Sequence, residues 1–206
     1  MPHYKLEQSY RGLRFVCGVD EAGRGPWAGP VVAAAVMYRS RRDIPRGVDD
    51  SKKLDRATRE TLHHKIMQRG VVGVGIASVE EIDRLNIWHA TSLAMRRALL
   101  AMAEWPELAL IDGNLTPQHL LCEARPVVKG DAVSYSIASA SIIAKVTRDR
   151  IMQKAAATYP HYGFDSHVGY GTPKHLNAIR EHGPCALHRK NWPIEALLQR
   201  DLFEVA

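Results

Sequence analysis

The stretch "RFVCGVDEAGRGPWAGPVVAAAVMY" (residues 14–38) predicts two strands joined by a glycine-rich turn. The first strand, 14–20, ends in two adjacent carboxylates, Asp20 and Glu21, and the second, 31–38, is apolar enough to be buried. Glycine-rich turns after a strand usually bind phosphate through their backbone, and two negative charges at the start of the turn repel it. The acidic pair therefore indicates a site that binds cations first and phosphate through them.

Composition and charge restrict the class of protein. The chain has 206 residues, of which 46% are hydrophobic and 24% charged, as in an ordinary globular domain with its own core. Lys and Arg number 28 against 22 for Asp and Glu, so the net charge is +6. Excess positive charge favours a polyanionic partner, although charge alone only shifts the odds towards nucleic acid.

The cysteines and the apolar runs bear on location. Cys17, Cys122 and Cys185 are odd in number and show no zinc-like spacing, so we expect a reduced, cytoplasmic chain. The polar start has no signal-peptide core, and the longest apolar run, 30–38, is too short to span a membrane. We expect no membrane association and, by default, a monomer.

The rest of the chain alternates between strands and helices. Further strands are expected at 71–79, 107–114 and 125–131. Helices are expected at 55–70, 86–104 and 134–159. The segment 170–183 contains one more, starting near Pro173, and a last short helix follows Pro193. The three early strands predict an antiparallel meander, and the later ones, separated by helices, predict parallel additions. The expected fold is α/β: a mixed sheet flanked by helices in a single domain, with residues 1–160 as core and 161–206 as a small helical extension.

Local signals define several helix ends. Asp55 can cap the helix that follows it and Gly70 can end that helix. Ser78 with Glu81 fits a capping box for a short helix before residue 86. The first half of 134–159 is rich in Ser and Ala, which allows this helix to lie close against a sheet.

Three predicted strands end in acidic residues, namely Asp20 with Glu21, Asp112 and Asp131. Active sites of α/β sheets collect at strand ends, so neighbouring strands would bring these four carboxylates together. Such a cluster needs raised pKa values or bound cations. Mg²⁺ and Mn²⁺ prefer oxygen ligands, and two such ions can stabilise both the attacking and the leaving oxygen of a phosphodiester.

Each acidic residue also has an ordinary structural explanation. Asp20 and Glu21 could cap a turn, Asp112 in "DGN" is a good turn residue, and Asp131 could cap the long helix. "GRGPWAG" (23–29) is a degenerate dinucleotide fingerprint, which its proline and the preceding acidic pair argue against. Three acidic strand ends in one chain favour the metal site.

Several segments in order along the chain carry a family resemblance. They are "GVDEAGRGPWAGPVVAAAV" (18–36), "DDSKKL" (49–54), "NIWHATSLAMRRAL" (86–99), "LIDGN" (110–114), "VVKGDAVSYSIASASIIAKVTRDRIM" (127–152) and "YPHYGFDSHVGYGTPKHLNAIREHGPCALHR" (159–189). Together they cover most of the chain, and the combination is highly specific. The chain resembles the bacterial ribonuclease HII family, the type 2 ribonucleases H.

The resemblance implies a ribonuclease H-like fold with a C-terminal helical extension. It implies a metal-dependent endonuclease that cuts RNA in RNA–DNA hybrids and single ribonucleotides embedded in duplex DNA, with roles in ribonucleotide excision and RNA primer removal. The catalytic, metal-binding carboxylates of the family fall on Asp20, Glu21, Asp112 and Asp131. The resemblance implies two divalent ions, Mn²⁺ or Mg²⁺, during catalysis.

Substrate recognition is also implied. The glycine–arginine–glycine motif of the family falls on Gly23, Arg24 and Gly25, and its substrate-sensing tyrosine on Tyr170. These groups are expected to hydrogen-bond the 2′-OH that distinguishes RNA from DNA. The ring of Tyr170 is expected to stack on the next deoxy sugar, which places the cut 5′ to the ribonucleotide and leaves 3′-hydroxyl and 5′-phosphate ends.

Other residues are weaker candidates. Candidate phosphate contacts, each of which could equally be a solvated surface charge, are Lys52, Lys53, Lys145 and Arg148. Histidines crowd the C-terminal third without a zinc spacing, so packing or surface roles are favoured. The chain departs from the family pattern at Trp27, Trp88, His89 and 189–197, none of which touches an expected metal ligand.

Two rival functions are weighed against the nuclease. A non-catalytic binder of RNA–DNA hybrids would not need four carboxylates facing phosphate. Another metal-dependent phosphoryl-transfer enzyme on the same fold, such as an integrase or a resolvase, would lack the glycine–arginine–glycine and tyrosine motifs. No clear clamp-binding peptide stands at either terminus, so contact with a replication clamp is open.

Overall fold

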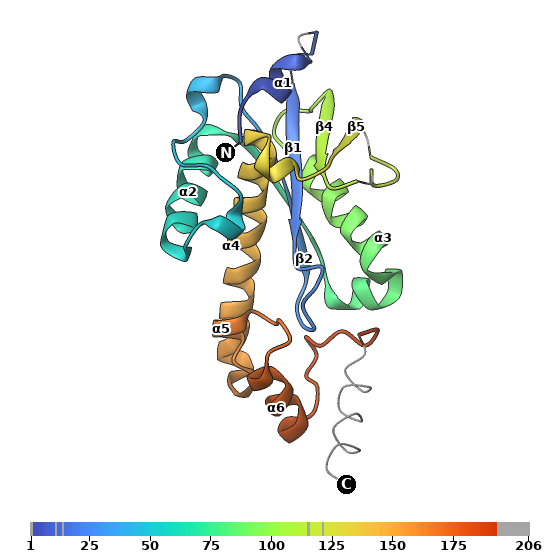
Figure 1. The fold of residues 1–206 in the computed structure, drawn as a ribbon. Helices are drawn as coiled ribbons and strands as arrows, with labels where there is room; N and C mark the ends of the chain where they lie inside the picture. The colour runs from blue at the N-terminus through green and yellow to red at the C-terminus, as the bar shows by residue number, and fades with distance from the viewer. Residues whose placement is uncertain (1, 11, 14, 115, 121, 193–206) are drawn as a thin grey trace.

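The computed structural model describes all residues except 1, 11, 14, 115, 121 and 193–206. Its centre is a five-stranded sheet in the order β3-β2-β1-β4-β5 (Figure 1). The strands are β1 (Val16–Ala22), β2 (Val31–Met37), β3 (Val71–Ala77), β4 (Leu108–Asp112) and β5 (Glu123–Val127). The first three pair antiparallel, whereas β4 pairs parallel with β1 and β5 parallel with β4. The predicted meander with parallel additions is confirmed.

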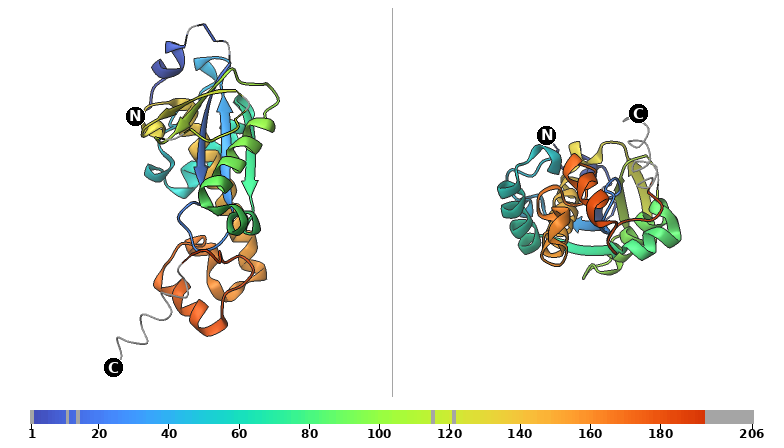
Figure 2. Two further views of the ribbon diagram at one scale, coloured as in Figure 1. Left: turned by 90° about the vertical axis from the view of Figure 1, so that its right-hand side faces the viewer. Right: turned by 90° about the horizontal axis from the view of Figure 1, so that it is seen from below.

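Helices cover both faces of the sheet. They are α1 (Lys5–Ser9), α2 (Arg56–Arg69), α3 (Val79–Leu100), α4 (Tyr135–Thr158), α5 (Phe164–His167) and α6 (Pro173–His182). Figures 1 and 2 show α3 on one face, and α4, backed by α2, on the other. Alternate residues of β1 and β2 face the two layers, so each face has its own apolar core.

The predicted helix ends agree with the structure. Asp55 accepts a hydrogen bond from the amide of Thr58, Gly70 is the C-cap of α2, and Ser78 with Glu81 forms the capping box. The two helices expected around residue 86 are one element, α3, interrupted at Asn86, where φ is 65°. The Asn86 side chain accepts hydrogen bonds from the amides of Trp88 and His89 and so caps the second part of the helix.

Helix α4 lies almost in backbone contact with β1, as its small residues predicted. A Cβ on Gly18 would lie 2.2 Å from the backbone nitrogen of Ile137. Glycine is therefore needed in mid-strand for close helix–sheet contact, which fixes the height of α4 above the strand that carries the acidic pair.

The C-terminal segments pack around the end of α4 that extends beyond the sheet (Figure 2). Their apolar cluster includes Phe164 and Ile179 and reaches back to Ala28 and Met152. The boundary proposed between 1–160 and 161–206 stays a prediction, and the helix expected after Pro193 lies outside the described residues. Among the helices that the structure describes, none is long and apolar enough to cross a membrane.

Candidate active site

Strand pairing brings Asp20 beside Asp112. In the parallel register Gly18 faces Leu110 and Val19 faces Ile111, so the next residues of the two strands are the aspartates. Ligand oxygens of Asp20, Asp112 and Asp131 all lie within 4.8 Å of one another. Within the described part of the chain this is the one group of three or more side chains that could hold a metal ion.

Two of these residues do not sit where the strand pattern put them. Asp20 lies two residues before the end of β1, and Asp131 lies beyond β5, in the short 3-10 helix Gly130–Ala132. The amide of Gly130 donates to Oδ1 of Asp112 over 2.7 Å, which ties the loop of Asp131 to the end of β4. The alternative role of Asp131 as cap of the long helix is wrong, because Ser134 is the N-cap of α4.

The electrostatics of the cluster favour a bound cation. Burial, followed by the charges of Glu21 and Asp112, raises the pKa of Asp20 well above its usual value. Burial and the Asp112 charge also raise the pKa of Asp131, whose Oδ2 lies 3.7 Å from Nζ of Lys52. Hard divalent cations bind such oxygen clusters and relieve this repulsion, so the residues present fit the expected metal.

Glu21 faces a different side of the sheet from Asp20. Adjacent strand residues point to opposite faces, so Asp20 lies towards α4 and Glu21 towards α3. Nη1 of Arg24 lies 3.3 Å from Oε1 of Glu21. Burial raises the pKa of Glu21, partly offset by Arg24. Glu21 thus borders the three aspartates whose ligand oxygens lie within 4.8 Å of one another, and its role as a metal ligand stays a prediction.

A cavity of about 490 Å³ opens beside the carboxylates. Its lining brings together most of the predicted site residues: Asp20, Glu21, Gly23, Arg24, Gly25, Lys52, Lys145 and Tyr170. Asp112 lies at the same strand edge but lines a neighbouring cavity, described below. Acidic, glycine-rich, basic and aromatic groups from distant parts of the chain therefore share one depression.

Two buried arginines hold the glycine-rich loop from beneath. The guanidinium of Arg148 donates to the carbonyls of Ala28, Pro30 and Val168 over 2.9–3.0 Å. That of Arg189 donates to the carbonyls of Gly23, Arg24 and Gly29 over 2.5–3.0 Å. Both arginines are 1% exposed. The amides of Trp27, Ala28 and Gly29 are also bonded, to the carbonyls of Gly169 and Leu187, so the N–H groups of the turn that could bind a ligand are those of Gly23, Arg24 and Gly25.

The phosphate contact predicted for Arg148 is therefore wrong. Its donors are used by backbone carbonyls in the interior, where a nucleic-acid backbone cannot reach them. Arg148 can approach the loop this closely because residue 23 is glycine. The φ of Gly23 is 101°, and a Cβ there would lie 2.2 Å from Nε of Arg148. Only glycine combines this backbone conformation with so close an approach.

The loop also positions Tyr170. The amides of Trp27 and Ala28 donate to the carbonyl of Gly169, and the indole of Trp27 occupies the space that a Cβ on Gly171 would need. The ring of Tyr170 reaches within 4.0 Å of where a Cβ on Gly25 would be. The tyrosine and the glycine-rich loop, distant in sequence, thus form adjoining walls.

The lysines differ in placement. Lys52 and Lys145 line the cavity, and Nζ of Lys145 lies 5.7 Å from the centre of the Tyr170 ring. Lys53 is not among the lining residues and pairs with Asp49 over 3.5 Å.

Buried histidines support the back of the tyrosine segment. Nδ1 of His175 lies 2.9 Å from the carbonyl of Tyr170, and its Nε2 lies 3.0 Å from Nε2 of His188. Both rings are buried, so the packing role favoured for these two histidines is confirmed.

Sequence reasoning missed Arg189 and gave Trp88 no role. Arg189 stood at the end of a family segment, yet nothing local marks an arginine as buried. Trp88 was noted only as a departure from the family pattern, and it lies beside Arg24 in the structure.

Comparison with known proteins shows which family this sequence matches. The model of the family described as Ribonuclease HII matches residues 17–194. Ribonuclease HII of Parvibaculum lavamentivorans is 52% identical over 206 residues, which cover 99% of this chain and 76% of the relative.

Solved structures agree with the sequence relatives. The PCNA:RNase HII complex from Archaeoglobus fulgidus matches with a TM-score of 0.74 and 27% identity, covering 86% of this chain and 95% of that one. Ribonuclease H2 from Pyrococcus horikoshii gives the same TM-score and identity over 92% and 99% of the two chains. Matches over most of the sequence and of the fold, together with the acidic cluster at the β1–β4 edge, establish that this chain belongs to the ribonuclease HII family of nucleases.

Proposed function

We propose that this enzyme hydrolyses the RNA strand of RNA–DNA hybrids and nicks duplex DNA 5′ to single embedded ribonucleotides. One observation carries the proposal: the three-aspartate cluster, the Gly23–Gly25 loop and Tyr170 converge on one strand edge. A nuclease for ribonucleotides needs both a cation site for the phosphodiester and a sensor for the 2′-OH. The same chemistry suits ribonucleotide excision and RNA primer removal, in the cytoplasmic setting expected from the sequence.

Asp20, Asp112 and Asp131, with Glu21 beside them, would hold the divalent cations, Mg²⁺ or Mn²⁺. Two such ions, when bound, would supply an activated water and stabilise the leaving 3′ oxygen, so that the products would carry 3′-hydroxyl and 5′-phosphate ends. The contribution of the chain is rigidity: Asp20 accepts from the amide of Glu21 and Asp112 from that of Gly130, each over 2.7 Å. Both carboxylates are thereby oriented before substrate arrives.

The glycine-rich loop would read the 2′-OH. Arg189 holds the carbonyls of Gly23 and Arg24 and so fixes the loop, from which the amides of Gly23, Arg24 and Gly25 would donate to a hydroxyl oxygen. Gly25 carries no side chain that would keep a ribose away.

Tyr170 would select the junction. The residue is 44% exposed and its ring adjoins Gly25, where its hydroxyl would reach the same 2′-OH while its face covers the next sugar. A hydroxyl on that next sugar would crowd the ring, so we propose a preference for a ribonucleotide followed by a deoxyribonucleotide. Lys52 and Lys145 would contact flanking phosphates from the same cavity.

We propose that residues 161–206 act as a substrate-binding extension of the catalytic core of residues 1–160. Tyr170 lies on the described part of this extension, and Arg189 links it to the glycine-rich loop. The archaeal ribonuclease HII was solved in a complex with PCNA, but no clamp contact is part of our proposal for this chain.

The test uses a labelled DNA duplex with one ribonucleotide, incubated with the enzyme and Mg²⁺ or Mn²⁺. An all-DNA duplex and a chelator lane are the controls. We expect one metal-dependent cut 5′ to the ribonucleotide and none in the all-DNA duplex. Cleavage that ignores ribose would instead support the integrase-like alternative, and binding without cleavage would support a non-catalytic hybrid binder.

Variants locate the activity in the proposed site. Asp112→Asn keeps an oxygen that can accept from Gly130, so it should fold and bind duplex while losing at least 100-fold in rate. Asp165→Asn, an exposed carboxylate on α5, is the matched control and should cut normally. Full activity of Asp112→Asn would refute the assignment.

A further inference from the structure

We propose that the cavity beside Trp88 is a second nucleoside subsite, which binds the cleaved strand on the opposite side of the carboxylates from Tyr170. The inference rests on the proposed function. It adds Trp88, which departs from the family pattern, to the residues proposed to bind the substrate. It concerns the nucleotides 5′ to the scissile phosphate.

Trp88 is held at the surface by its helix. The residue is 51% exposed, which is unusual for one with so large an apolar side chain. The side chain of Asn86 accepts from the amides of Trp88 and His89 over 3.0 and 3.2 Å, and so begins a new helical turn at the kink of α3. The ring is therefore presented from a fixed backbone rather than from a loose loop.

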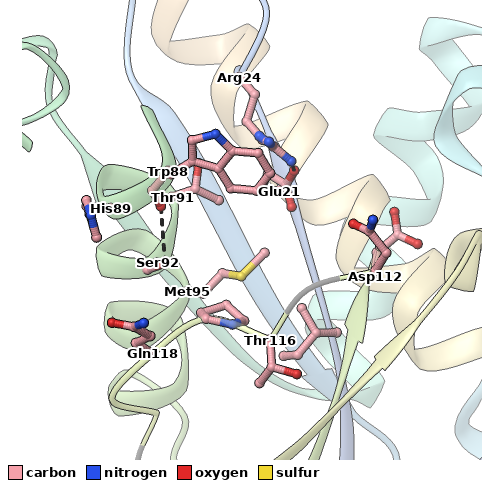
Figure 3. Close-up of a pocket in the computed structure, with 14 residues that line it drawn as sticks. Glu21, Arg24, Trp88, His89, Thr91, Ser92, Met95, Asp112, Thr116 and Gln118 are labelled. Atoms are coloured by element: carbon pink, nitrogen blue, oxygen red, sulfur yellow. Dashed lines mark hydrogen bonds and ion pairs between the residues drawn. The ribbon is translucent and has the colours of Figure 1, made fainter. Parts of the chain in front are cut away.

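A cavity of about 280 Å³ lies beside the ring (Figure 3). Met95 and Ile111, both buried, contribute apolar surface to it. Glu21 and Asp112 lie at the side nearest the proposed metal site, whereas Thr91 and Ser92 of α3 add hydroxyl groups. The cavity thus has an apolar floor and polar groups around it, and it lies next to carboxylates that would hold cations. Such a cavity suits a nucleoside.

The two cavities lie on either side of the same residues. Glu21 and Arg24 line both of them, Tyr170 lines one, and Trp88 the other. Of the aromatic side chains that the structure describes, the large exposed ones are Trp88, Trp105 and Tyr170, and only Trp105 lies away from this edge. A strand that runs from Tyr170 across the carboxylates next meets Trp88. Since Tyr170 would take the 3′ side, Trp88 takes the 5′ side.

Arg24 adds charge to this platform. Its guanidinium carbon lies 4.3 Å from the centre of the Trp88 ring, while Nη1 contacts Glu21. A guanidinium stacked on an indole forms a flat surface with positive charge at its edge. Such a surface can cover the face of a sugar or base and remain close to the adjoining phosphate.

The first arm of the test measures KM and kcat for cleavage of a duplex with one ribonucleotide. Trp88→Leu should raise KM about tenfold, the size expected for loss of one stacking contact, and leave kcat within about twofold. Trp88→Phe should recover most of the affinity. Trp105→Leu removes another exposed indole away from the site, at a residue that is 44% exposed, and should change neither constant. A fall in kcat without a change in KM would show that Trp88 acts only by holding Arg24, and would overturn the subsite.

The second arm changes the substrate at each of the first three nucleotides 5′ to the cut, by an abasic residue or by a 2′-O-methyl group. At one position, one of these changes should raise the KM of the wild-type enzyme about tenfold. The same change should raise the KM of Trp88→Leu much less. Sensitivity to the abasic residue identifies a base contact, and sensitivity to the methyl group identifies a sugar contact. Equal effects on both proteins at all three positions would overturn the proposal.

Equilibrium binding of the same duplexes in Ca²⁺ buffer, followed by fluorescence anisotropy, separates the two proposals. If wild type does not cut the unmodified duplex, the proposed function fails. The Trp88-dependent binding difference then still decides whether the subsite exists.

Discussion

The guanidinium groups of Arg148 and Arg189 both donate to the carbonyl oxygen of Pro30, over 3.0 and 3.5 Å. One arginine comes from α4 and the other from the segment after α6, so the turn between β1 and β2 is held by two distant parts of the chain. Within the part of the chain that the structure describes, the hydrogen bonds of both guanidinium groups go to backbone carbonyls and not to carboxylates. Burial lowers the pKa of Arg189 to about 9, which leaves it charged at neutral pH.

Arg189→Leu should destabilise the protein and impair substrate recognition. The change leaves the carbonyls of Gly23, Arg24 and Gly29 without their donor, and each buried unsatisfied group costs about 1–3 kcal/mol. We expect a loss of about 3 kcal/mol in the free energy of unfolding, measured with urea, and a higher KM for ribonucleotide-containing duplex. Arg69→Leu, at an exposed position on α2, is the control. Wild-type stability and KM in Arg189→Leu would show that the loop keeps its shape without this arginine.

Gly18→Ala should destabilise the fold strongly. The added Cβ would lie 2.2 Å from the Ile137 backbone nitrogen, so α4 would have to move away from β1. Overpacking of this kind costs about 1–3 kcal/mol or more. Gly12→Ala, where nothing lies within 4 Å, is the matched control. A thermal midpoint unchanged by Gly18→Ala would contradict the close packing described for α4.

Tyr170→Ala should lose junction preference more than Tyr170→Phe. Phenylalanine keeps the ring that would cover the deoxy sugar and lacks only the hydroxyl. The measurement is the ratio of cleavage rates on a single embedded ribonucleotide and on a continuous RNA strand paired with DNA. We expect Tyr170→Ala to lower this ratio about tenfold or more, and Tyr170→Phe to lower it less. An unaltered ratio in Tyr170→Ala would remove the tyrosine from the proposed sensor.

Divalent cations should raise the thermal stability of the protein. Three carboxylates with ligand oxygens within 4.8 Å repel one another, and an ion that binds only the folded state stabilises it by mass action. Scanning calorimetry in chelator and in increasing Mn²⁺ should show a rising midpoint. Asp20→Asn should diminish this rise, whereas Asp165→Asn should preserve it. A midpoint independent of metal in wild type would speak against the site.

Stability should fall as the solution is acidified through the histidine range. Burial lowers the pKa of His175 from its ordinary value of 6.5 to about 4, so the unfolded chain takes up this proton at higher pH than the folded one. The stabilisation from neutral His175 is present above pH 6.5, declines as pH falls below 6.5, and is lost by about pH 4. Between pH 7 and pH 5 this amounts to about 2 kcal/mol.

Urea unfolding at pH 7 and pH 5 measures this difference. His175→Gln removes the titrating group and should reduce the loss between the two pH values relative to wild type. His64→Gln, an exposed histidine on α2, should retain the wild-type loss. The same loss in His175→Gln as in wild type would assign the pH dependence to other groups.

Local sequence patterns predicted the structure correctly where it depends on interactions between residues close in sequence. The caps at Asp55 and Ser78 and the alternation of strands and helices depend on neighbours in sequence, and all appear in the structure. Asp131 shows the limit of such patterns. It was expected at a strand end, but it reaches the site from a 3-10 helix beyond β5, because the Gly130 amide binds Asp112 across 18 residues.

The sequence by itself determined the mixed α/β class, the acidic residues and the family resemblance, because composition, periodicity and ordered motifs are written along the chain. Only the tertiary structure decided which side chains meet. It buried Arg148, joined Arg189 to the glycine-rich loop, brought Asp131 beside Asp20 and Asp112, and set Trp88 beside Arg24. These placements depend on contacts between residues far apart in the chain, more than 100 positions for the two arginines, and a charged or aromatic side chain carries no local sign of them.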